Sequence, residues 1–404
     1  MRNSHLETVC VVATRFPWPP VSGAERRLYH QIQMLRTKYN VVLVSESASL
    51  GDSLEEDERS IADVVIKVGR KGCSSRFGTA LYSLGVPPLQ VQLHFNRSLH
   101  TVLREVEAEY ESVATFYSLV RTGPYTVGRT SAAILDYCDA LSAQFENRTA
   151  HESSPVKRRV FQLESKLLRR YERKISRNCE AVLVTTPADR DKLPSGTIVI
   201  PNSFDSEEPV WRGGGNSKNI QLPPEAILFF GDMSTTYSEL AATWFAREIL
   251  PLVLDKYPNA SFWVVGRAPT SRILELENDR NVHVTGSVNA ISDYLNSCAL
   301  AVAPLLFGTG IKNKLLESFA ARVPVVCTSV ADDGMYAADH GAVLVGDTPV
   351  EFADQVCSLL GSADRRVALG EKGYEFANGK YGADAVRWEL LEAVELARER
   401  WASR

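Results

Sequence analysis

A cluster of glycines, lysines and a glutamate late in the chain has the residue types that a site for a diphosphate-linked sugar needs. It follows an apolar run that ends at Pro304, and its members are Gly308, Thr309, Gly310, Lys312, Lys314 and Glu317. Glycines at a strand-to-helix corner allow the backbone to approach an anion, and the helix N-terminus adds free N–H groups and a positive dipole end. The lysines add positive charge, and the carboxylate can accept hydrogen bonds from sugar hydroxyls. This combination indicates a nucleotide-sugar site.

A purely structural role for the same cluster stays open. The glycines could form only a tight turn, and Lys314 and Glu317 could form an i, i+3 ion pair on a solvated helix face. The position after an apolar strand favours a binding site, because ligands of open parallel sheets lie at the carboxyl ends of the strands. Other predicted strands in the same half of the chain also end in glycine, at Gly231, at Gly266 beside Arg267, and at Gly286.

A second glycine corner lies near the start of the chain, where Ser22 and Gly23 follow a proline-rich loop and open a helical pattern. The N–H group of Gly23 could meet a phosphate there. Ser22, with Glu25 three residues later, also matches a capping box with Ser22 as the N-cap. The two roles are compatible.

Short apolar runs alternate with helical patterns along the chain, which predicts parallel, doubly wound sheets. In the first half the expected strands are 8–13, 41–44, 64–68, 112–117, 132–137 and 181–185. In the second half they are 226–230, 261–265, 282–285, 299–304, 323–327 and 342–345. Helices are expected at 240–256 and 290–296, and the tail from 351 to 401 is expected to be helical throughout.

Length and linker composition predict two domains. A chain of 404 residues is too long for one ordinary core. The polar, glycine-rich segment 212–219 is the best linker. We place one domain at 1–203 and a second at 204–385. The fold class is therefore α/β, with two Rossmann-like domains.

Charge and cysteine content disfavour several classes of protein. The net charge of -4 does not favour a nucleic-acid binder. The seven cysteines form no C-x-x-C pair, so we expect reduced thiols in a cytoplasmic protein. The N-terminus lacks the apolar core of a signal peptide, and no apolar run is long enough to span a bilayer.

One strongly basic stretch, 157–177, is expected to be helical with an apolar side. It could bind an anionic membrane surface, which would make the protein membrane-peripheral. Glu164 and Glu172 are interleaved with its basic residues. They favour the alternative, a solvated helix face with ion pairs.

Motifs across nearly the whole chain resemble the retaining family-4 glycosyltransferases of the GT-B fold. The most specific stretch is 308–328, and further matches are Phe229-Phe230-Gly231-Asp232-Met233, Ile249-Leu250-Pro251, Val265-Gly266-Arg267, Val284-Thr285-Gly286 and Pro324-Val325-Val326-Cys327-Thr328. In the first half, 17–25 resembles the family's first loop, and Pro201-Asn202 resembles its domain crossing. The segment 136–142 resembles the corresponding segment in a branch of the family that acts in exopolysaccharide assembly.

This resemblance implies an architecture. Two Rossmann-like domains would face each other across a cleft, and a last helix at 386–404 would cross back to the first domain. The apolar residues expected to pack that helix are Trp388, Leu390, Leu391, Val394 and Leu396.

The resemblance also implies roles for the site residues. Lys312 and Lys314 would neutralise the donor diphosphate, and Glu317 would bind the ribose hydroxyls. Gly23 would donate its N–H to the β-phosphate, and the backbone near Val288 would hold the base. In such retaining chemistry the leaving phosphate can itself deprotonate the acceptor, so neither a metal nor another cofactor is expected.

Three positions depart from the family pattern. Thr309 stands where a first glutamate is common, and Asp232 stands where a phosphate-binding arginine is common. Ser203 replaces the glycine that usually follows the Pro-Asn pair. More of the phosphate binding would therefore fall to Lys312 and Lys314.

The candidate catalytic residues are Asp136 and Asp139, together with Lys312. The two aspartates follow an apolar strand and could contact the acceptor or the donor sugar. N-capping and loop hydrogen bonding are the alternative for both. Cys138 between them is expected to be a packed thiol, because no base partner is evident.

We therefore predict a retaining glycosyltransferase that moves a sugar from a nucleoside-diphosphate donor, with UDP favoured, to an acceptor hydroxyl. Its partners would be that donor and an unidentified acceptor, and it would be a monomer or a homodimer. Two alternatives are a nucleotide-sugar epimerase and a non-catalytic nucleotide-sugar-binding protein. Product analysis without acceptor separates the first, and donor binding without turnover would support the second.

Overall fold

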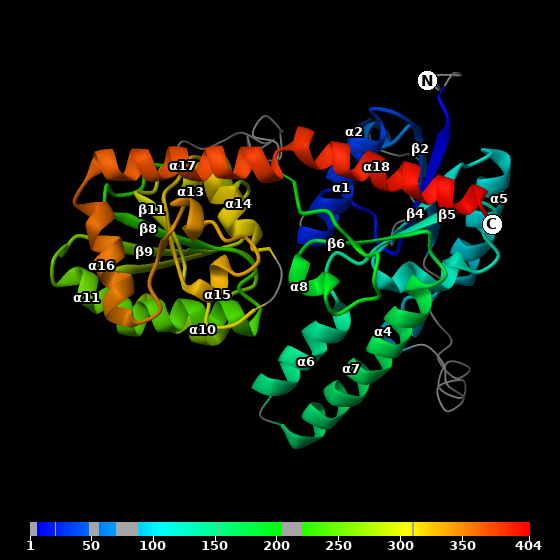
Figure 1. Ribbon diagram of the computed structural model, residues 1–404. Coiled ribbons are helices and arrows are strands. Elements are labelled where there is room, and N and C mark those ends of the chain that lie inside the picture. Colours follow the sequence, from blue (N-terminus) through cyan, green and yellow to red (C-terminus); the bar gives the residue numbers. More distant parts are fainter. Residues whose placement is uncertain are drawn as a thin grey trace. The chain divides into compact units, whose positions relative to one another are not determined.

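The chain folds into two compact units, each with its own parallel sheet covered by helices (Figure 1). The structure, a computed structural model, describes residues 6–20, 22–47, 56–69, 88–152, 154–203, 220–308 and 311–404. The first unit comprises Met1–Ser203 and Asp384–Arg404, and the second comprises Phe204–Ala383. The predicted α/β class with two parallel sheets is confirmed. The linker at 212–219 lies outside the described residues.

The first unit is built on a seven-stranded parallel sheet with the order β3-β2-β1-β4-β5-β6-β7. Its central strands are buried on both faces, as expected for a sheet between two layers of helices. The strands are β1 (Thr8–Ala13), β2 (Asn40–Ser47), β3 (Val64–Gly69), β4 (Ala114–Ser118), β5 (Ala132–Asp136), β6 (Ala181–Val184) and β7 (Ile198–Val199). The predicted strands are confirmed to within a few residues. β7 was not predicted, because two residues are too short to leave a pattern.

The helices of the first unit connect these strands. They are α1 (Gly23–Leu35), α2 (Glu56–Ser60), α4 (Leu89–Gln92), α5 (Arg97–Glu109), η1 (Val120–Thr126), α6 (Leu141–His151), α7 (Pro155–Ser176) and α8 (Pro187–Arg190). Leu28, Ile32 and Leu35 recur at helical spacing in α1 and are buried. This burial fixes the orientation of α1 on the sheet.

The second unit has a six-stranded parallel sheet with the order β10-β9-β8-β11-β12-β13. The strands are β8 (Ala226–Phe230), β9 (Ser261–Val265), β10 (Val282–Gly286), β11 (Leu300–Ala303), β12 (Val325–Cys327) and β13 (Leu344–Val345). Its shorter helices are α12 (Ser271–Leu274), η3 (Glu275–Asn278), α13 (Ile291–Leu295), α14 (Asn313–Ala320), α15 (Ser329–Asp332) and η4 (Ala338–His340). Aromatic side chains fill the core. Phe245 and Phe262 lie with ring centroids 4.3 Å apart.

The helix predicted at 240–256 is interrupted. It consists of α10 (Thr236–Trp244), a π-helical turn η2 (Phe245–Ile249) and α11 (Leu250–Leu254). Pro251 has no N–H group and cannot continue the regular hydrogen-bond ladder. The π-helical turn η2, with its wider i→i+5 hydrogen bonds, lies just before this proline.

The C-terminal tail is three helices rather than one: α16 (Pro349–Leu360), α17 (Ala363–Tyr381) and α18 (Ala383–Ala402). The breaks come at Gly361 and Gly382. At each of these positions a Cβ would lie 2.6 Å or less from a neighbouring oxygen. The prediction of an unbroken helix was therefore wrong at these two glycines.

α18 packs on the first unit, to which Asp384–Arg404 belongs. The Glu395 carboxylate accepts hydrogen bonds from Lys38 and Tyr39. Leu390 and Val394 are fully buried, as expected, whereas the Trp388 side chain is 67% exposed. The prediction that Trp388 packs against the first unit was wrong. Among the described residues, no helix is both long and apolar enough to cross a membrane.

Candidate functional site

The glycine corners of the second unit meet at the switch point of its sheet. β8 lies between β9 and β11, so the chain moves outward from β8 in one direction through β9 and β10, then returns to start β11 on the other side. Gly231 directly follows β8, and Gly308 follows β11. Open parallel sheets bind ligands at such a point, outside the carboxyl ends of the strands.

The glycines are required by backbone geometry. Gly231, Gly266 and Gly308 have φ angles of +147°, +153° and +147°, a region that strains any residue with a side chain. A Cβ on Gly266 would lie 1.8 Å from the Gly231 carbonyl oxygen. The backbones at the ends of β8 and β9 therefore pack directly against each other and leave a surface without side chains.

Lys314, in the first turn of α14, extends over this glycine surface. Its Nζ atom lies 4.3 Å from the centre of the Phe229 ring and 3.7 Å from the place that a Gly231 Cβ would take. The Nζ atom is buried and has no hydrogen-bond partner among the described residues. The pKa of Lys314 is lowered to about 7, mainly by burial and also by the nearby charge of Lys312, while the charge of Glu317 opposes the shift.

These contacts test one structural alternative for the cluster, a solvated helix face with an ion pair. Glu317 is 6% exposed, and the ammonium of Lys314 does not form the i, i+3 hydrogen bond to it. The alternative of a solvated helix face with an ion pair is therefore wrong. α14 instead turns a buried cation and a buried carboxylate toward the interior of its unit.

Lys312 has the same relation to the next glycine corner. It is the residue that caps α14. Its Cε and Nζ atoms lie 3.5 and 3.8 Å from the place that a Gly308 Cβ would take. Each lysine therefore covers one glycine corner at the switch point. The predicted site residues Thr309 and Gly310 lie outside the described residues.

An arginine reaches the same edge from the next strand. Arg267 follows β9, and its Nη2 atom lies 2.7 Å from the Asp232 carboxylate after β8. Burial raises the pKa of Asp232, but hydrogen bonds from Ser234 and the Arg267 charge outweigh burial and lower it. The sequence showed only that Asp232 stands where an arginine is common. It did not predict that Asp232 holds the guanidinium of Arg267, whose side chain is 53% exposed.

Val288, which was predicted to lie near the base, follows β10 at the same edge. It is partly buried and packs against the core of the second unit. Its place at a strand end agrees with the position expected of a base-binding segment, and its contact with a base stays a prediction.

The capping box predicted at the start of α1 is present. The Ser22 hydroxyl accepts from the Glu25 N–H, and the Glu25 carboxylate accepts from the Ser22 N–H at 2.8 Å. Arg15 also pairs with Glu25 at 3.4 Å. Gly23 occupies the first helical position, and its contact with a phosphate stays a prediction.

Asp136 lies in a buried ion pair. Its two carboxylate oxygens accept from the Arg27 guanidinium at 2.8 and 2.9 Å, and Gln31 donates to one of them. Both side chains of the ion pair are 3% exposed. Burial lowers the pKa of Arg27, but Asp136 outweighs burial and raises it. With its oxygens engaged in this way, Asp136 is placed to hold the fold, and its catalytic role stays a prediction.

The same arginine holds the end of the first unit. Arg27 Nη1 donates to the Pro201 carbonyl and to Asn202 Oδ1, both at 3.1 Å. His30 lies 3.1 Å from the Ser203 hydroxyl. Helix α1 therefore fixes the segment through which the chain leaves the unit.

Asp139 is partly buried and accepts hydrogen bonds from Thr185 and Gln144 at 3.0 and 3.2 Å. Loop hydrogen bonding, the alternative left open by the sequence, is thus present. Its catalytic role stays a prediction. Burial raises the pKa of the Cys138 thiol well above its usual value, which agrees with a packed thiol rather than a nucleophile.

Sequence reasoning missed three arginines at the corresponding edge of the first unit. In that sheet β1 lies between β2 and β4, so the segments after β1 and β4 meet at the switch point. Arg15 follows β1 and Arg121 follows β4. Burial lowers the pKa of Arg121, and the charges of Arg15 and of Arg148 on α6 lower it further.

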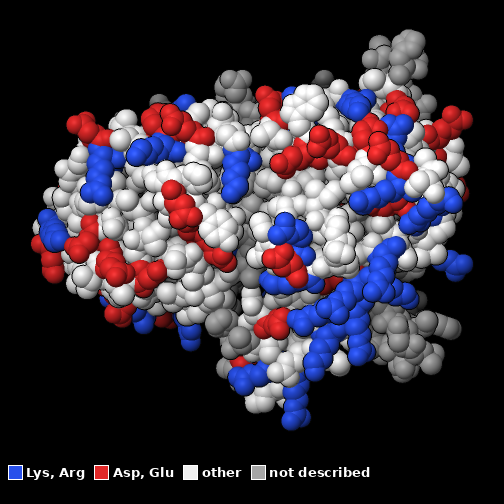
Figure 2. Space-filling view, viewed as in Figure 1, with Lys and Arg blue, Asp and Glu red and all other residues white. Residues whose placement is uncertain are grey.

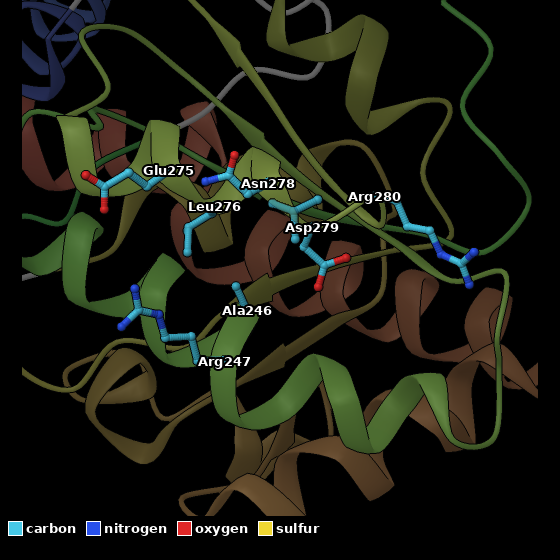
Figure 3. A pocket seen from close by; sticks show the side chains of 8 residues that line it. Ala246, Arg247, Glu275, Leu276, Asn278, Asp279 and Arg280 are labelled. Atoms are coloured by element: carbon cyan, nitrogen blue, oxygen red, sulfur yellow. The ribbon is translucent and has the colours of Figure 1, made fainter.

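An open hollow elsewhere on the second unit lies beside the amino end of β10 (Figure 3). Charged side chains of both signs surround it, and its polar lining includes Arg247, Glu275, Asn278, Asp279 and Arg280. The glycine corners lie at the carboxyl ends of the strands, so this hollow is separate from the lysine site.

Solved structures share the fold over almost the whole chain. The sucrose-phosphate synthase of Thermosynechococcus elongatus superposes with a TM-score of 0.68 at 13% identity, and the match covers 98% of this chain and 100% of that one. The Anabaena protein HepE, solved in complex with UDP and glucose, gives a TM-score of 0.62 at 15% identity over 97% of this chain and 100% of its own. Residues 224–362 match the family described as "Glycosyl transferases group 1". The chain therefore has the GT-B fold, and most of its second unit matches this glycosyltransferase family.

The family match covers the glycine corners and both lysines of the second unit. The chain is also 20% identical over 399 residues to an "Uncharacterized 44.6 kDa protein in cps region" of Klebsiella pneumoniae, covering 94% of this chain and 97% of that protein.

Proposed function

We propose that this protein is a glycosyltransferase that transfers a sugar, with retention of configuration, from a nucleoside-diphosphate donor to an acceptor hydroxyl. The observation that carries the proposal is the Lys314 ammonium, buried at the switch point without a hydrogen-bond partner among the described residues. A buried cation with unused donors is costly unless an anion binds it. A diphosphate held over Gly231 and Gly308 would meet this need.

The other residues at the edge have complementary roles in this proposal. Lys312 and Lys314 neutralise the charge that builds up on the leaving diphosphate, and Arg267 adds a third cation. Glu317 accepts hydrogen bonds from the ribose, and the backbone near Val288 holds the base. Preorganised charge of this kind lowers the barrier because it stabilises the leaving group as the bond breaks.

UDP is the favoured nucleotide, and a capsular or other exopolysaccharide is the favoured context. HepE, which has the same fold, was solved with UDP and glucose. The similarity to a protein of a Klebsiella cps region supports the context. The leaving phosphate would take the acceptor proton, so the proposed reaction needs no metal ion.

The test first measures by calorimetry the affinities of UDP, GDP, ADP and their glucose conjugates for the wild type and for Lys314→Met. Turnover is then followed by NMR with a panel of acceptors. We expect one nucleotide to bind at least tenfold more tightly than the others and the product to keep the donor's anomeric configuration. An inverted product would overturn retention.

The same experiment separates the alternatives. Isomerisation of the donor sugar without acceptor would assign an epimerase. Saturable donor binding with no transfer to any acceptor and no hydrolysis would assign a binding protein. Equal nucleotide affinity in wild type and Lys314→Met would remove Lys314 from the donor site.

A further inference from the structure

The hairpin of α6 and α7 projects from the first unit (Figure 1). The two helices pack along each other, with the Phe145 and Phe161 rings 5.7 Å apart and the Ser165 hydroxyl donating to the Ser142 carbonyl. α6 begins shortly after the carboxyl end of β5. The hairpin therefore extends from the edge at which this sheet would bind a ligand.

The acidic residues of α7 face the interior of the first unit. The Glu164 carboxylate accepts from the Gln90 N–H at 3.0 Å, and the Glu172 carboxylate accepts from the N–H and the hydroxyl of Ser142. Their exposed fractions are 5% and 1%. The expectation that these two glutamates neutralise a solvated basic face was wrong, because both are used inside the fold.

The outer face of α7 is consequently basic and apolar. Figure 2 shows Lys and Arg side chains gathered along it. The exposed cations are Lys157, Arg158, Arg159, Lys166, Arg170, Arg173 and Lys174. Exposed apolar side chains lie on the amino-terminal half of the same face, where Val156 is 73%, Val160 is 53% and Leu163 is 57% exposed. The spacing 156, 160, 163 places these three on one side of the helix.

Acidic partners near this face are few among the described residues. Glu146 on α6 pairs with Arg169 at the surface. Glu152 uses its backbone carbonyl to accept from Arg158 and its side chain to accept from the Ser154 N–H. The exposed cations therefore outnumber the nearby carboxylates.

We propose that the outer face of the α6–α7 hairpin docks on an anionic membrane surface. The cations would lie against lipid phosphates, and Val156, Val160 and Leu163 would enter the headgroup region. A soluble polyanion would be attracted by the same charges, but it would gain nothing from three exposed apolar side chains. The combination of apolar and basic residues on one helix face therefore fits a lipid surface.

The test is flotation of the full chain with vesicles of phosphatidylcholine alone and of phosphatidylcholine mixed with phosphatidylglycerol. One variant replaces the apolar set (Val156→Ser, Val160→Ser, Leu163→Ser), and a second replaces four cations (Arg159→Gln, Lys166→Gln, Arg170→Gln, Arg173→Gln). The matched control removes four exposed cations of the second unit (Arg247→Gln, Arg280→Gln, Arg365→Gln, Lys372→Gln). Because the replaced side chains are exposed, melting temperatures should stay near that of the wild type.

We expect the wild type and the control to float with the anionic vesicles and not with the neutral ones. Each removed charge should lower partitioning about fivefold, so the four-cation variant should lose a hundredfold or more. The serine variant should also bind more weakly at constant charge. Failure of the wild type to bind anionic vesicles at low salt would overturn the proposal. Stronger binding to soluble heparin than to vesicles, unchanged in the serine variant, would also overturn it and would assign the face to a soluble polyanion.

Discussion

The Lys314 ammonium lies 4.3 Å from the centre of the Phe229 ring, on the side where Gly231 leaves room above the sheet. The ring face attracts the cation, but such a contact supplies only part of what water would supply. The ammonium is buried without a hydrogen-bond partner among the described residues. The charge of Lys314 therefore lowers the stability of the free protein, and the same charge would bind the donor diphosphate.

Lys314→Met should separate the effect of this charge on stability from its effect on donor binding. Methionine keeps the length of the side chain and removes the charge. We expect the free energy of unfolding at pH 6 to rise by about 1–3 kcal/mol, which is the cost of a buried polar group without a partner. Affinity for the nucleotide sugar should fall about 10- to 100-fold, as expected for the loss of a charge-assisted hydrogen bond. Thermal unfolding and calorimetry measure the two effects.

Lys372→Met is the matched control, because Lys372 is an exposed lysine of the same unit. It should change neither the melting temperature nor the affinity. If Lys314→Met were less stable than the wild type and still bound the donor fully, Lys314 would be a structural residue.

Donor affinity should depend on pH near neutrality. Without ligand, the pKa of Lys314 is lowered to about 7, and a bound diphosphate would raise it. Binding then favours the protonated form, so affinity is complete below pH 7 and falls, by up to about tenfold per pH unit, as the pH rises toward the pKa of the bound state. UDP-glucose is a suitable probe because its diphosphate is esterified at both ends and lacks the ionisation near pH 6. The dependence should disappear in Lys314→Met, and an equal slope in both proteins would assign it to another group.

The stability of the free protein should change with pH in the opposite sense. The folded-state pKa of Lys314 lies below its ordinary value of 10.5. The unfolded chain therefore binds more protons between about pH 7 and 10.5, and stability gains a contribution as the pH rises through that range. Comparing urea midpoints of the wild type and Lys314→Met at pH 6 and pH 9 isolates this contribution. The two proteins should differ most at pH 6, and a constant difference would contradict a titrating Lys314.

Removing the charge of Asp232, which pairs with Arg267, should raise the affinity for the nucleotide sugar. Asp232 partly neutralises the guanidinium at the donor edge, so Asp232→Asn should strengthen nucleotide-sugar binding about two- to fivefold, the range of a partly exposed ion pair. Arg267→Gln should weaken binding by a similar factor. Glu239→Gln is the control, because Glu239 pairs with Arg272 at the surface of the same unit. If Asp232→Asn weakened binding, the carboxylate itself would contact the donor.

The sequence predicted the edge of the site better than its interior. Gly231, Gly266 and Gly308 could be placed because a glycine directly after a buried strand marks a corner where the backbone turns at the sheet edge. The burial of Lys314 could not be foreseen, since an i, i+3 spacing shows that Lys314 and Glu317 share a helix face but not whether that face meets water. Glu164 and Glu172 were misassigned for the same reason. Their partners, Gln90 and Ser142, are 74 and 30 residues distant in sequence.

The Asp136 and Arg27 pair shows the same limit at greater distance. The two residues are 109 positions apart, and no local pattern connects them. Asp136→Asn would leave the guanidinium of Arg27 buried without its counter-charge, so we expect a loss of about 3–5 kcal/mol in the free energy of unfolding, measured by urea denaturation. Arg27→Met should cost a similar amount.

The double variant Arg27→Met with Asp136→Leu decides what the pair does. It removes both charges together, so it should recover much of the stability lost by either single change. Donor binding should persist in it, because the lysine site belongs to the other unit. If Asp136→Asn instead cost less than about 1 kcal/mol and abolished transfer while donor binding persisted, the carboxylate would act in the reaction, as the sequence first suggested.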